Sequence, residues 1–355
     1  MLTLRMERRV GTPNWLVVVV TLFSLTLGLL SAAVVFLIYG VDPLLAYQKI
    51  FVGSFGSLYG LSETVVKAIP LMLCALGLVV AFKALVWNIG AEGQLLMGAT
   101  GATWIALSFP EASPLLLVPS MFAIGFASGV VWGFLPAIMK AKLKANEVIT
   151  TLMMNYIAIE LVKFLVYGPW KGSEEWGFPY TNKFSPSAWL PRIPDTRIHY
   201  QTLILELGLA ALLLILMSRT KLGFEIKVTG ENPQAASYAG MNYVKVVVLV
   251  MAISGGLAGM AGVGEVAGIH YRLRYPQGIS PGYGYTAIIV AWLGRLNPYA
   301  TVLASLLLGG LLVGGDAIQV SLGLPVATIN IFNGLILFFV LAGDILTRYR
   351  ISLTR

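Results

Sequence analysis

The stretch WLVVVVTLFSLTLGLLSAAVVFLIY, residues 15–39, carries no charged side chain. A helix that crosses the hydrocarbon core of a bilayer needs about 20 predominantly apolar residues. The apolar core of a cleaved secretory signal is shorter, so this stretch predicts a retained first membrane helix. Arg5, Arg8 and Arg9 precede it. By the positive-inside rule, these arginines place the N-terminus in the cytoplasm.

The composition of the whole chain agrees with a lipid environment. Of 355 residues, 57% are hydrophobic and 11% are charged, and the mean hydropathy is +0.82. A water-soluble domain keeps about a quarter of its residues charged, so most of this chain is expected to lie in lipid. The length is then taken up by membrane segments and short loops, and we expect a single domain over residues 1–355.

Nine further apolar runs follow the first. An even number of crossings returns the C-terminus to the cytoplasm, where Arg348 and Arg350 follow the last run. The sequence therefore predicts an all-α polytopic membrane protein of about ten helices with both termini inside. A faint symmetry about the loop 218–243 leaves an inverted repeat open. The ten predicted segments are 15–39, 64–82, 89–108, 115–139, 147–167, 201–217, 244–265, 283–294, 299–316 and 326–343.

The net charge of +8 does not indicate nucleic-acid binding. The basic residues lie in short segments between apolar runs, so no contiguous basic face can follow a phosphate backbone. Cys74 is the single cysteine and there are two histidines, which excludes an internal disulfide and makes a poor ligand set for zinc. We expect neither a metal nor a cofactor.

The inner loop 218–243 contains the strongest local signal. Asn232 is a good N-cap, Pro233 suits the first helical position, and Gly240 suits a left-handed stop. These residues predict a helix of about two turns with both ends marked. Its small side chains offer little area to anchor it on its own protein. Two interpretations remain open: a helix that docks into another protein, or a surface helix that shapes the turn between two membrane segments.

The segment GENPQAASYAG, residues 230–240, resembles the ATPase-coupling loop of permeases from ABC importers for nucleosides and simple sugars. That group lies within the larger set of ribose and branched-chain amino-acid permeases, and the similarity covers most of the chain. Five motifs occur in the order and spacing of a ten-span topology. Besides 230–240 they are NIGAEGQ at 88–94, KANEVITTLMMN at 144–155, SGGLAGMAG at 254–262 and LGRLNP at 293–298.

The resemblance implies a type II-like importer permease in the cell membrane. A cytoplasmic ABC ATPase dimer would grip the coupling helix, a second permease of the same or a different kind would complete the pathway, and an extracytoplasmic lipoprotein would deliver the solute. This chain has no G-x-x-x-x-G-K-[ST] loop, so ATP is hydrolysed elsewhere and the chain is not itself an enzyme. The predicted coupling residues are Gly230, Glu231, Asn232, Pro233, Ala235, Ala236, Tyr238 and Gly240.

Polar side chains within predicted membrane segments are costly to bury and are candidates for the solute pathway. Glu92 stands between Gly90 and Gly93, where a helix is expected to open, and Asn88 and Gln94 flank it. Transporters place solute sites at broken helices, because freed backbone groups face the cavity there. The alternative is that Glu92 answers the positive N-terminus of a helix at the cytoplasmic surface.

Two further candidates lie deeper in the chain. Asn155, two turns into the fifth segment, can reach the pathway from there. Glu265 follows the small-residue run 255–264, which allows helices to approach closely. It lines the outer mouth or pairs with Arg272 or Arg274.

The outer loop 168–200 is rich in tryptophan and proline, with Trp170, Trp176 and Trp189. These tryptophans either dock the delivery protein or form an aromatic belt at the membrane interface.

A different functional class also remains open, namely a secondary transporter that couples a small polar solute to an ion. Such a protein needs its own ion site in the membrane, and no membrane segment carries a pair of carboxylates that suggests one. No H-E-x-x-H motif occurs, which argues against a zinc-dependent membrane enzyme. A charged ligand cage is not evident either, which favours a neutral polar solute such as a nucleoside or a sugar.

Overall fold

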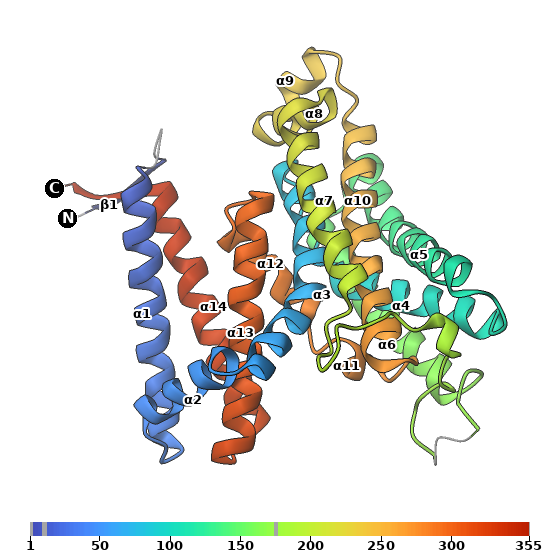
Figure 1. Ribbon diagram of the computed structural model, residues 1–355. Coiled ribbons are helices and arrows are strands. Elements are labelled where there is room, and N and C mark those ends of the chain that lie inside the picture. Colours follow the sequence, from blue (N-terminus) through green and yellow to red (C-terminus); the bar gives the residue numbers. More distant parts are fainter. Residues whose placement is uncertain (1–2, 9–12, 174–176, 355) are drawn as a thin grey trace. The chain divides into compact units, whose positions relative to one another are not determined.

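A computed structural model describes residues 3–8, 13–173 and 177–354, and helices dominate it (Figure 1). Trp176 of the outer loop lies outside these residues. The chain packs as two compact units. Unit 1 joins Met1–Thr64 to Gly310–Arg355, and unit 2 comprises Val65–Gly309. The helices α3 (Leu58–Lys83) and α13 (Pro298–Leu322) each contribute to both units, and a single permease domain over residues 1–355 stays a prediction.

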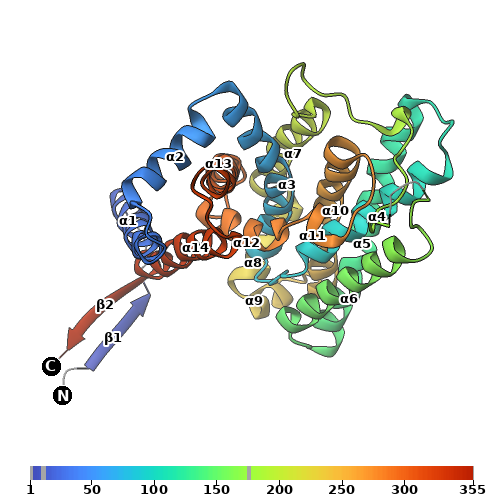
Figure 2. The ribbon, with the colours of Figure 1, turned by 90° about the horizontal axis from the view of Figure 1, so that it is seen from below.

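Unit 1 brings the two ends of the chain together. Strand β1 (Thr3–Arg8) pairs antiparallel with β2 (Tyr349–Thr354), as Figure 2 shows. The all-α prediction missed this ribbon, because only the fold brings the two termini into register. That both termini lie on the cytoplasmic side, after an even number of crossings, stays a prediction.

The core of unit 1 lies between helices from the two ends of the sequence. Helix α1 (Asn14–Ile38) packs along α14 (Val326–Arg348), and the ring of Phe36 lies 5.6 Å from that of Phe332. The helix α2 (Pro43–Phe55), which we did not predict, starts at Asp42, whose side chain accepts from the amide of Leu44 at 2.9 Å. Its Ile50 joins the same apolar core.

Unit 2 holds the remaining helices. The segment η2 is a π-helix that continues α10 without a break, and η1 is a short 3₁₀ turn. The bounds are α4 Ala91–Ser108, α5 Pro114–Leu143, α6 Glu147–Tyr167, η1 Pro186–Ala188, α7 Tyr200–Arg219, α8 Lys221–Glu231, α9 Pro233–Tyr238, α10 Tyr243–Val263, η2 Gly264–His270, α11 Pro276–Ile279 and α12 Tyr283–Leu293.

Each of the ten predicted segments lies on a helix. Among the described residues, seven helices are long and apolar enough to cross a membrane: α1, α3, α5, α6, α7, α10 with η2, and α13. The helix α4 is not among them, and α12 and the apolar part of α14 are shorter. The protein is therefore helical and membrane-embedded, whereas the count of ten crossings stays a prediction.

The centre of unit 2 is built on backbone contact between helices. A Cβ added at Gly98 of α4 would collide with the backbone of Gly259 in α10, and one at Gly129 of α5 would collide with Gly255. Helices that meet at glycine approach closely enough for their backbones to touch. The small-residue run 255–264, which was predicted to allow close helix packing, lies at these contacts.

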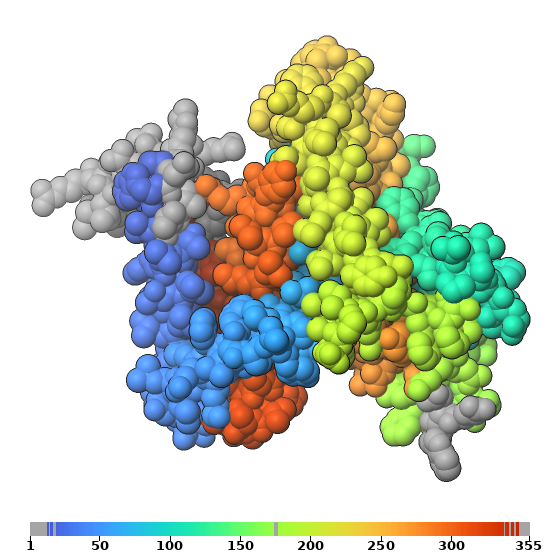
Figure 3. Space-filling model, viewed as in Figure 1, coloured from blue at the N-terminus to red at the C-terminus, as the bar shows by residue number. Residues whose placement is uncertain are grey.

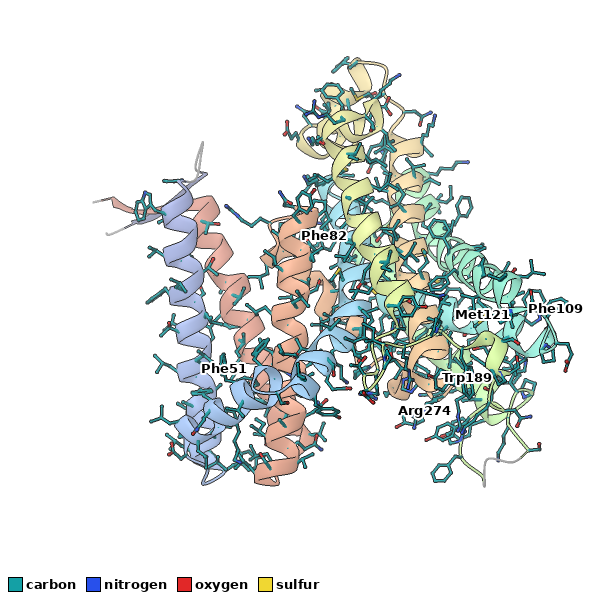
Figure 4. The ribbon with its side chains drawn as sticks, in the orientation of Figure 1. Phe51, Phe82, Phe109, Met121, Trp189 and Arg274 are labelled. Carbon is teal, nitrogen blue, oxygen red and sulfur yellow. The ribbon has the colours of Figure 1, made fainter. Side chains whose placement is uncertain are left out.

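The two ends of unit 2 differ in construction. In Figure 1, α8 and α9 form one end, and η2 with the outer loop lies at the other. The space-filling view in Figure 3 shows α8 and α9 projecting beyond the neighbouring helices of this unit. Figure 4 labels Phe82 toward the α8 end, and Trp189 and Arg274 toward the other.

Candidate solute and coupling site

A buried network of amide side chains surrounds the break between α3 and α4. The Nδ2 of Asn88 donates to Oε1 of Gln94 and to Oγ of Ser254, both at 2.9 Å. Its Oδ1 accepts from the amide of Gly90 at 2.9 Å. Asn88 and Ser254 are fully buried and Gln94 nearly so. These bonds hold the non-helical linker between two helices against α10, as a helix break inside a membrane requires.

Asn155 of α6 extends this network across the start of α4. Its Oδ1 accepts from the amide of Gly93 at 2.8 Å, and its Nδ2 donates to the carbonyl of Ile89 at 2.9 Å. The same Nδ2 donates to the hydroxyl of Tyr285 at 3.1 Å. Because the phenol oxygen accepts this bond, its own hydrogen is available to a further acceptor. Tyr285 is partly exposed, unlike Asn155.

Glu92 joins the N-termini of two helices. It lies in the first turn of α4, and its Oε2 accepts from the amide of Gly284 in the first turn of α12 at 2.8 Å. A Cβ added at Gly284 would collide with the backbone of Glu92, so the two helices touch here. An acidic group at a helix N-terminus satisfies free amides and favours the helix dipole. Glu92 thus lies at the start of its own helix and satisfies an amide at the start of α12. Its roles in the solute pathway and at the cytoplasmic surface both stay predictions.

Glu265 lies apart from these bonds, in η2. Its Oε2 is 3.5 Å from Nε2 of His270, and its side chain is almost fully buried. The sequence suggested Arg272 or Arg274 as partners. The structure pairs it with His270 instead, while Arg274 approaches Nδ1 of His270 at 3.3 Å. Of the five candidate pathway residues, four therefore come together around the helix break.

The predicted coupling helix is present as α9. The Oδ1 of Asn232 accepts from the amides of Gln234 and Ala235, both at 3.0 Å, and Pro233 occupies the first position. Gly240 has φ +78°, the left-handed conformation expected of a stop. Ala236 is buried, whereas the other members of the set from Glu231 to Gly240 are exposed, Tyr238 to 94%.

Gly230 connects this end to the membrane helices. A Cβ added there would collide with the carbonyl oxygen of Lys83, the last residue of α3. The rings of Phe82, Trp87 and Trp292 lie close by, with centroids 5.3 to 5.6 Å apart. The short linker that follows Lys83 leads directly to Asn88, so the coupling end and the amide network share one piece of chain.

Comparison with known proteins identifies the family. The family profile described as branched-chain amino acid transport system / permease component matches residues 60–341. The chain belongs to this permease family. The resemblance seen in the motifs is confirmed, and the protein is an integral, multi-pass component of the cell membrane.

Individual relatives of the permease share most of its length. The glucose ABC transporter permease protein TsgB13 of Haloferax volcanii is 34% identical over 99% of this chain and 94% of its own. The guanosine ABC transporter permease protein NupP of Bacillus subtilis is 34% identical, with 90% of this chain and 92% of its own covered. The nucleoside ABC transporter permease protein NupB of Lactococcus lactis is 32% identical, with 91% and 90% covered.

Sequence reasoning missed two residues of the site, Ser254 and Tyr285, and one residue outside it, Arg192, which binds the backbone of η2. Ser254 opens one of the quoted motifs, but nothing in its own chemistry distinguishes it from a packing residue. Tyr285 follows Gly282, whose left-handed φ of +99° could be suspected from the glycine. Arg192 gave no signal, because its partners are backbone carbonyls. Within the described residues, no group of three or more His, Cys, Asp or Glu could hold a metal.

Proposed function

We propose that the permease forms the translocation pathway for a nucleoside or simple sugar, and that a separate ATPase dimer drives it through the coupling helix 232–240. The observation that carries this proposal is the construction of α9. It is capped by Asn232 at its start and followed by Gly240, and it exposes nearly all of its side chains. It also follows closely on Gly230 of α8, whose backbone lies against the end of α3. Such a helix is accessible, and it is connected through α8 to the membrane helices.

Force applied to α9 has a short route to the amide network. It passes from Gly230 to Lys83, along the linker to Asn88, and from there to Gln94 and Ser254. Since Asn155 and Glu92 bind the same helix start, displacement of the linker alters how α4 meets α6 and α12. Coupling then requires only that this junction has two arrangements that the ATPase biases.

The polar groups of the junction suit a neutral solute. Amides and a hydroxyl offer donors and acceptors without a fixed charge, and Tyr285 presents its O–H at the partly exposed edge of the network. We therefore place Asn88, Glu92, Gln94 and Asn155 behind the pathway wall as its support, with Tyr285 touching the solute. The printed names of the relatives, which specify glucose, guanosine and nucleosides, support the same solute class.

Reconstituted uptake tests this proposal. The permease is assembled in proteoliposomes with its partner permease, its ATPase and its delivery lipoprotein, and is offered labelled guanosine and labelled glucose in parallel. Uptake of one of them that requires ATP and the ATPase is the expected result. Uptake at full rate without the ATPase, abolished when the proton gradient is collapsed, would instead establish an ion-coupled transporter.

The variant Glu92→Gln probes the junction itself. The Oε1 of glutamine can still accept from Gly284, so assembly and thermal stability should be retained, whereas the second carboxyl oxygen is replaced by an amide nitrogen that cannot accept a hydrogen bond. We expect uptake to fall by roughly tenfold, the effect of about 1.4 kcal/mol on a rate. Glu160→Gln, at an exposed carboxylate of α6, is the matched control. Equal uptake by the two variants would leave Glu92 a purely structural cap.

A further inference from the structure

The outer loop binds the backbone of η2 and of the residues that follow it. The amide of Thr181 donates to the carbonyl of Leu273 at 3.0 Å, that of Phe184 to Tyr271 at 2.8 Å, and that of Leu190 to Ala267 at 3.0 Å. These three bonds are spaced along the loop, so it follows the helix end rather than touching it once. The loop therefore acts as a strap across η2.

Arg192 makes the tightest connection between the strap and η2. Its Nε and Nη2 donate to the carbonyl of Gly268 at 2.9 and 2.6 Å, and Nη2 also donates to that of Ile269 at 3.1 Å. Its guanidinium lies 4.5 Å from the ring centre of Tyr271, which stacks on Trp189 at 4.4 Å. The last carbonyls of a helix have no partner within it, and a cation at this position satisfies them and favours the dipole.

The π-helical register of η2 decides which side chains meet. Glu265 and His270 are five residues apart and lie 3.5 Å from each other. On an α-helix of 3.6 residues per turn, residues five apart point about 140° away from each other. The i→i+5 bonding of a π-helix brings them onto one face. The Glu265–His270 pair therefore exists only while this segment keeps the π register.

His199 completes the outer end of η2. A Cβ added at Gly268 would press on its ring, so the ring lies directly against the helix backbone. Burial, helped by the charge of Arg192, lowers the pKa of His199 to about 4. The ring is therefore neutral at physiological pH and can share this space with the guanidinium. Tyr271 then ends the helix at φ +57°, a conformation uncommon for a non-glycine residue, under its stacking with Trp189 and Arg192.

We propose that Arg192 is a positioning residue for transport, which holds Gly264–His270 in the π register and thereby keeps Glu265 paired with His270. Loss of the guanidinium removes the hydrogen-bond donors to the last carbonyls of η2. The segment then relaxes toward the α register that its neighbour α10 already has. Glu265 then turns away from His270 and changes the outer end of α10. The structural half of this inference, that Arg192 holds the π register, is independent of the proposed function. The transport half, that Arg192 affects transport, rests on the proposed function.

Hydrogen exchange on the assembled complex in nanodiscs tests the structural half. In Arg192→Ala we expect amide exchange in residues 264–271 to accelerate by about fivefold or more, the size of a modest coupling between sites. The α9 segment should be unchanged. Arg192→Lys, which keeps the charge but not the two-pronged donor, should lie between that variant and the original protein. Lys183→Ala, an exposed cation of the same loop, is the matched control and should change nothing.

Unchanged exchange in Arg192→Ala overturns the proposal. If Arg192→Ala fails to assemble, exchange in Arg192→Lys equal to that of the original protein overturns it instead. The transport half is measured as solute taken up per ATP hydrolysed in proteoliposomes. We expect this ratio to fall by about fivefold or more in the Arg192 variants while ATP hydrolysis continues. Faster exchange with an unaltered ratio would reduce Arg192 to a structural clamp. Failure of the original protein to take up solute would refute the proposed function and leave the exchange result standing.

Discussion

The two ends of unit 2 are stabilised in opposite ways. We call the end with α9 the inner end and the end with η2 the outer end, after the orientation predicted from the sequence. At the inner end, α9 is specified by its own residues: Asn232 caps it, Pro233 starts it and Gly240 ends it. At the outer end, η2 is specified by residues far away in sequence, above all Arg192 and His199. The inner end is largely exposed, whereas the outer end is bound along its backbone by the strap.

This difference separates a segment that a partner protein can bind from a segment that the rest of the fold controls. A helix whose start and end are set by its own residues does not depend on distant contacts for its boundaries, so a partner can bind its exposed face without changing them. A segment held by distant contacts changes register when those contacts change, so it can respond to a solute or a docking partner. Between the two ends, α4 and α12 meet at Glu92 and Gly284. Direct contact between the two helices holds this junction, without a local capping signal or a loop across it.

The largest effect is expected at that middle junction. Gly284→Ala adds a methyl group where the backbone of Glu92 already lies, so α4 and α12 must separate. We expect a loss of about 3 kcal/mol of unfolding free energy, the upper range for overpacking. Thermal unfolding in detergent measures this loss. Gly208→Ala, in α7 with open space around it, is the control and should be neutral or slightly stabilising. Equal stability of both variants would contradict the close approach.

A smaller effect is expected at the outer end as the pH falls. His199 has a pKa of about 4 when folded and about 6.5 when unfolded, so the unfolded chain binds the extra proton first. The free energy of unfolding contributed by the neutral His199 ring is complete above pH 6.5 and is lost as the pH falls toward 4. Between pH 7.5 and 5.5 we expect about 1 kcal/mol less stability relative to His199→Gln. Unfolding curves of the two proteins across this range give the difference, and parallel pH profiles would refute it.

At the inner end the expected effect on global stability is smallest. Asn232→Ala removes the acceptor for two amides of α9, a loss of about 1 kcal/mol that is confined to this short helix. Amide exchange in residues 233–238 should rise, while the unfolding midpoint stays the same. Asn242→Ala, which removes the equivalent cap of α10, is the matched control and should leave α9 unaffected. Global destabilisation by Asn232→Ala would show that α9 belongs to the packed core.

Much of this structure could be predicted because its signals are local. Runs such as residues 15–39 identified the helices by length and polarity alone, and Asn232, Pro233 and Gly240 marked α9 within one residue of its observed start. Asn146 caps the helix that follows it in the same local way, whereas Asp42 caps α2, a helix that we did not predict. These features depend on neighbours in sequence, so no knowledge of the fold is needed to recognise them.

The remainder depends on contacts that sequence order conceals. The partner of Glu92 is an amide nearly two hundred residues away, and the pairing of β1 with β2 joins the two ends of the chain. The π register of η2 follows from Arg192 and His199, neither of which resembles a helix signal. The sequence left Glu265 either at the outer mouth or paired with Arg272 or Arg274, and His270 was not considered because an α-helical register points it away from Glu265.

The central claim is that α9 is the part of the permease that the ATPase holds, and Ala235→Arg tests it most directly. Ala235 is exposed, so the new side chain leaves the fold intact, unlike a change at the buried Ala236. Gln201→Arg, exposed at the start of α7, adds the same charge at the other end of unit 2. The binding affinity of the ATPase is measured for both variants in nanodiscs. A loss of about tenfold or more for Ala235→Arg, with Gln201→Arg unaffected, is the predicted result. Full affinity and full ATP-driven uptake with Arg at position 235 would contradict the account.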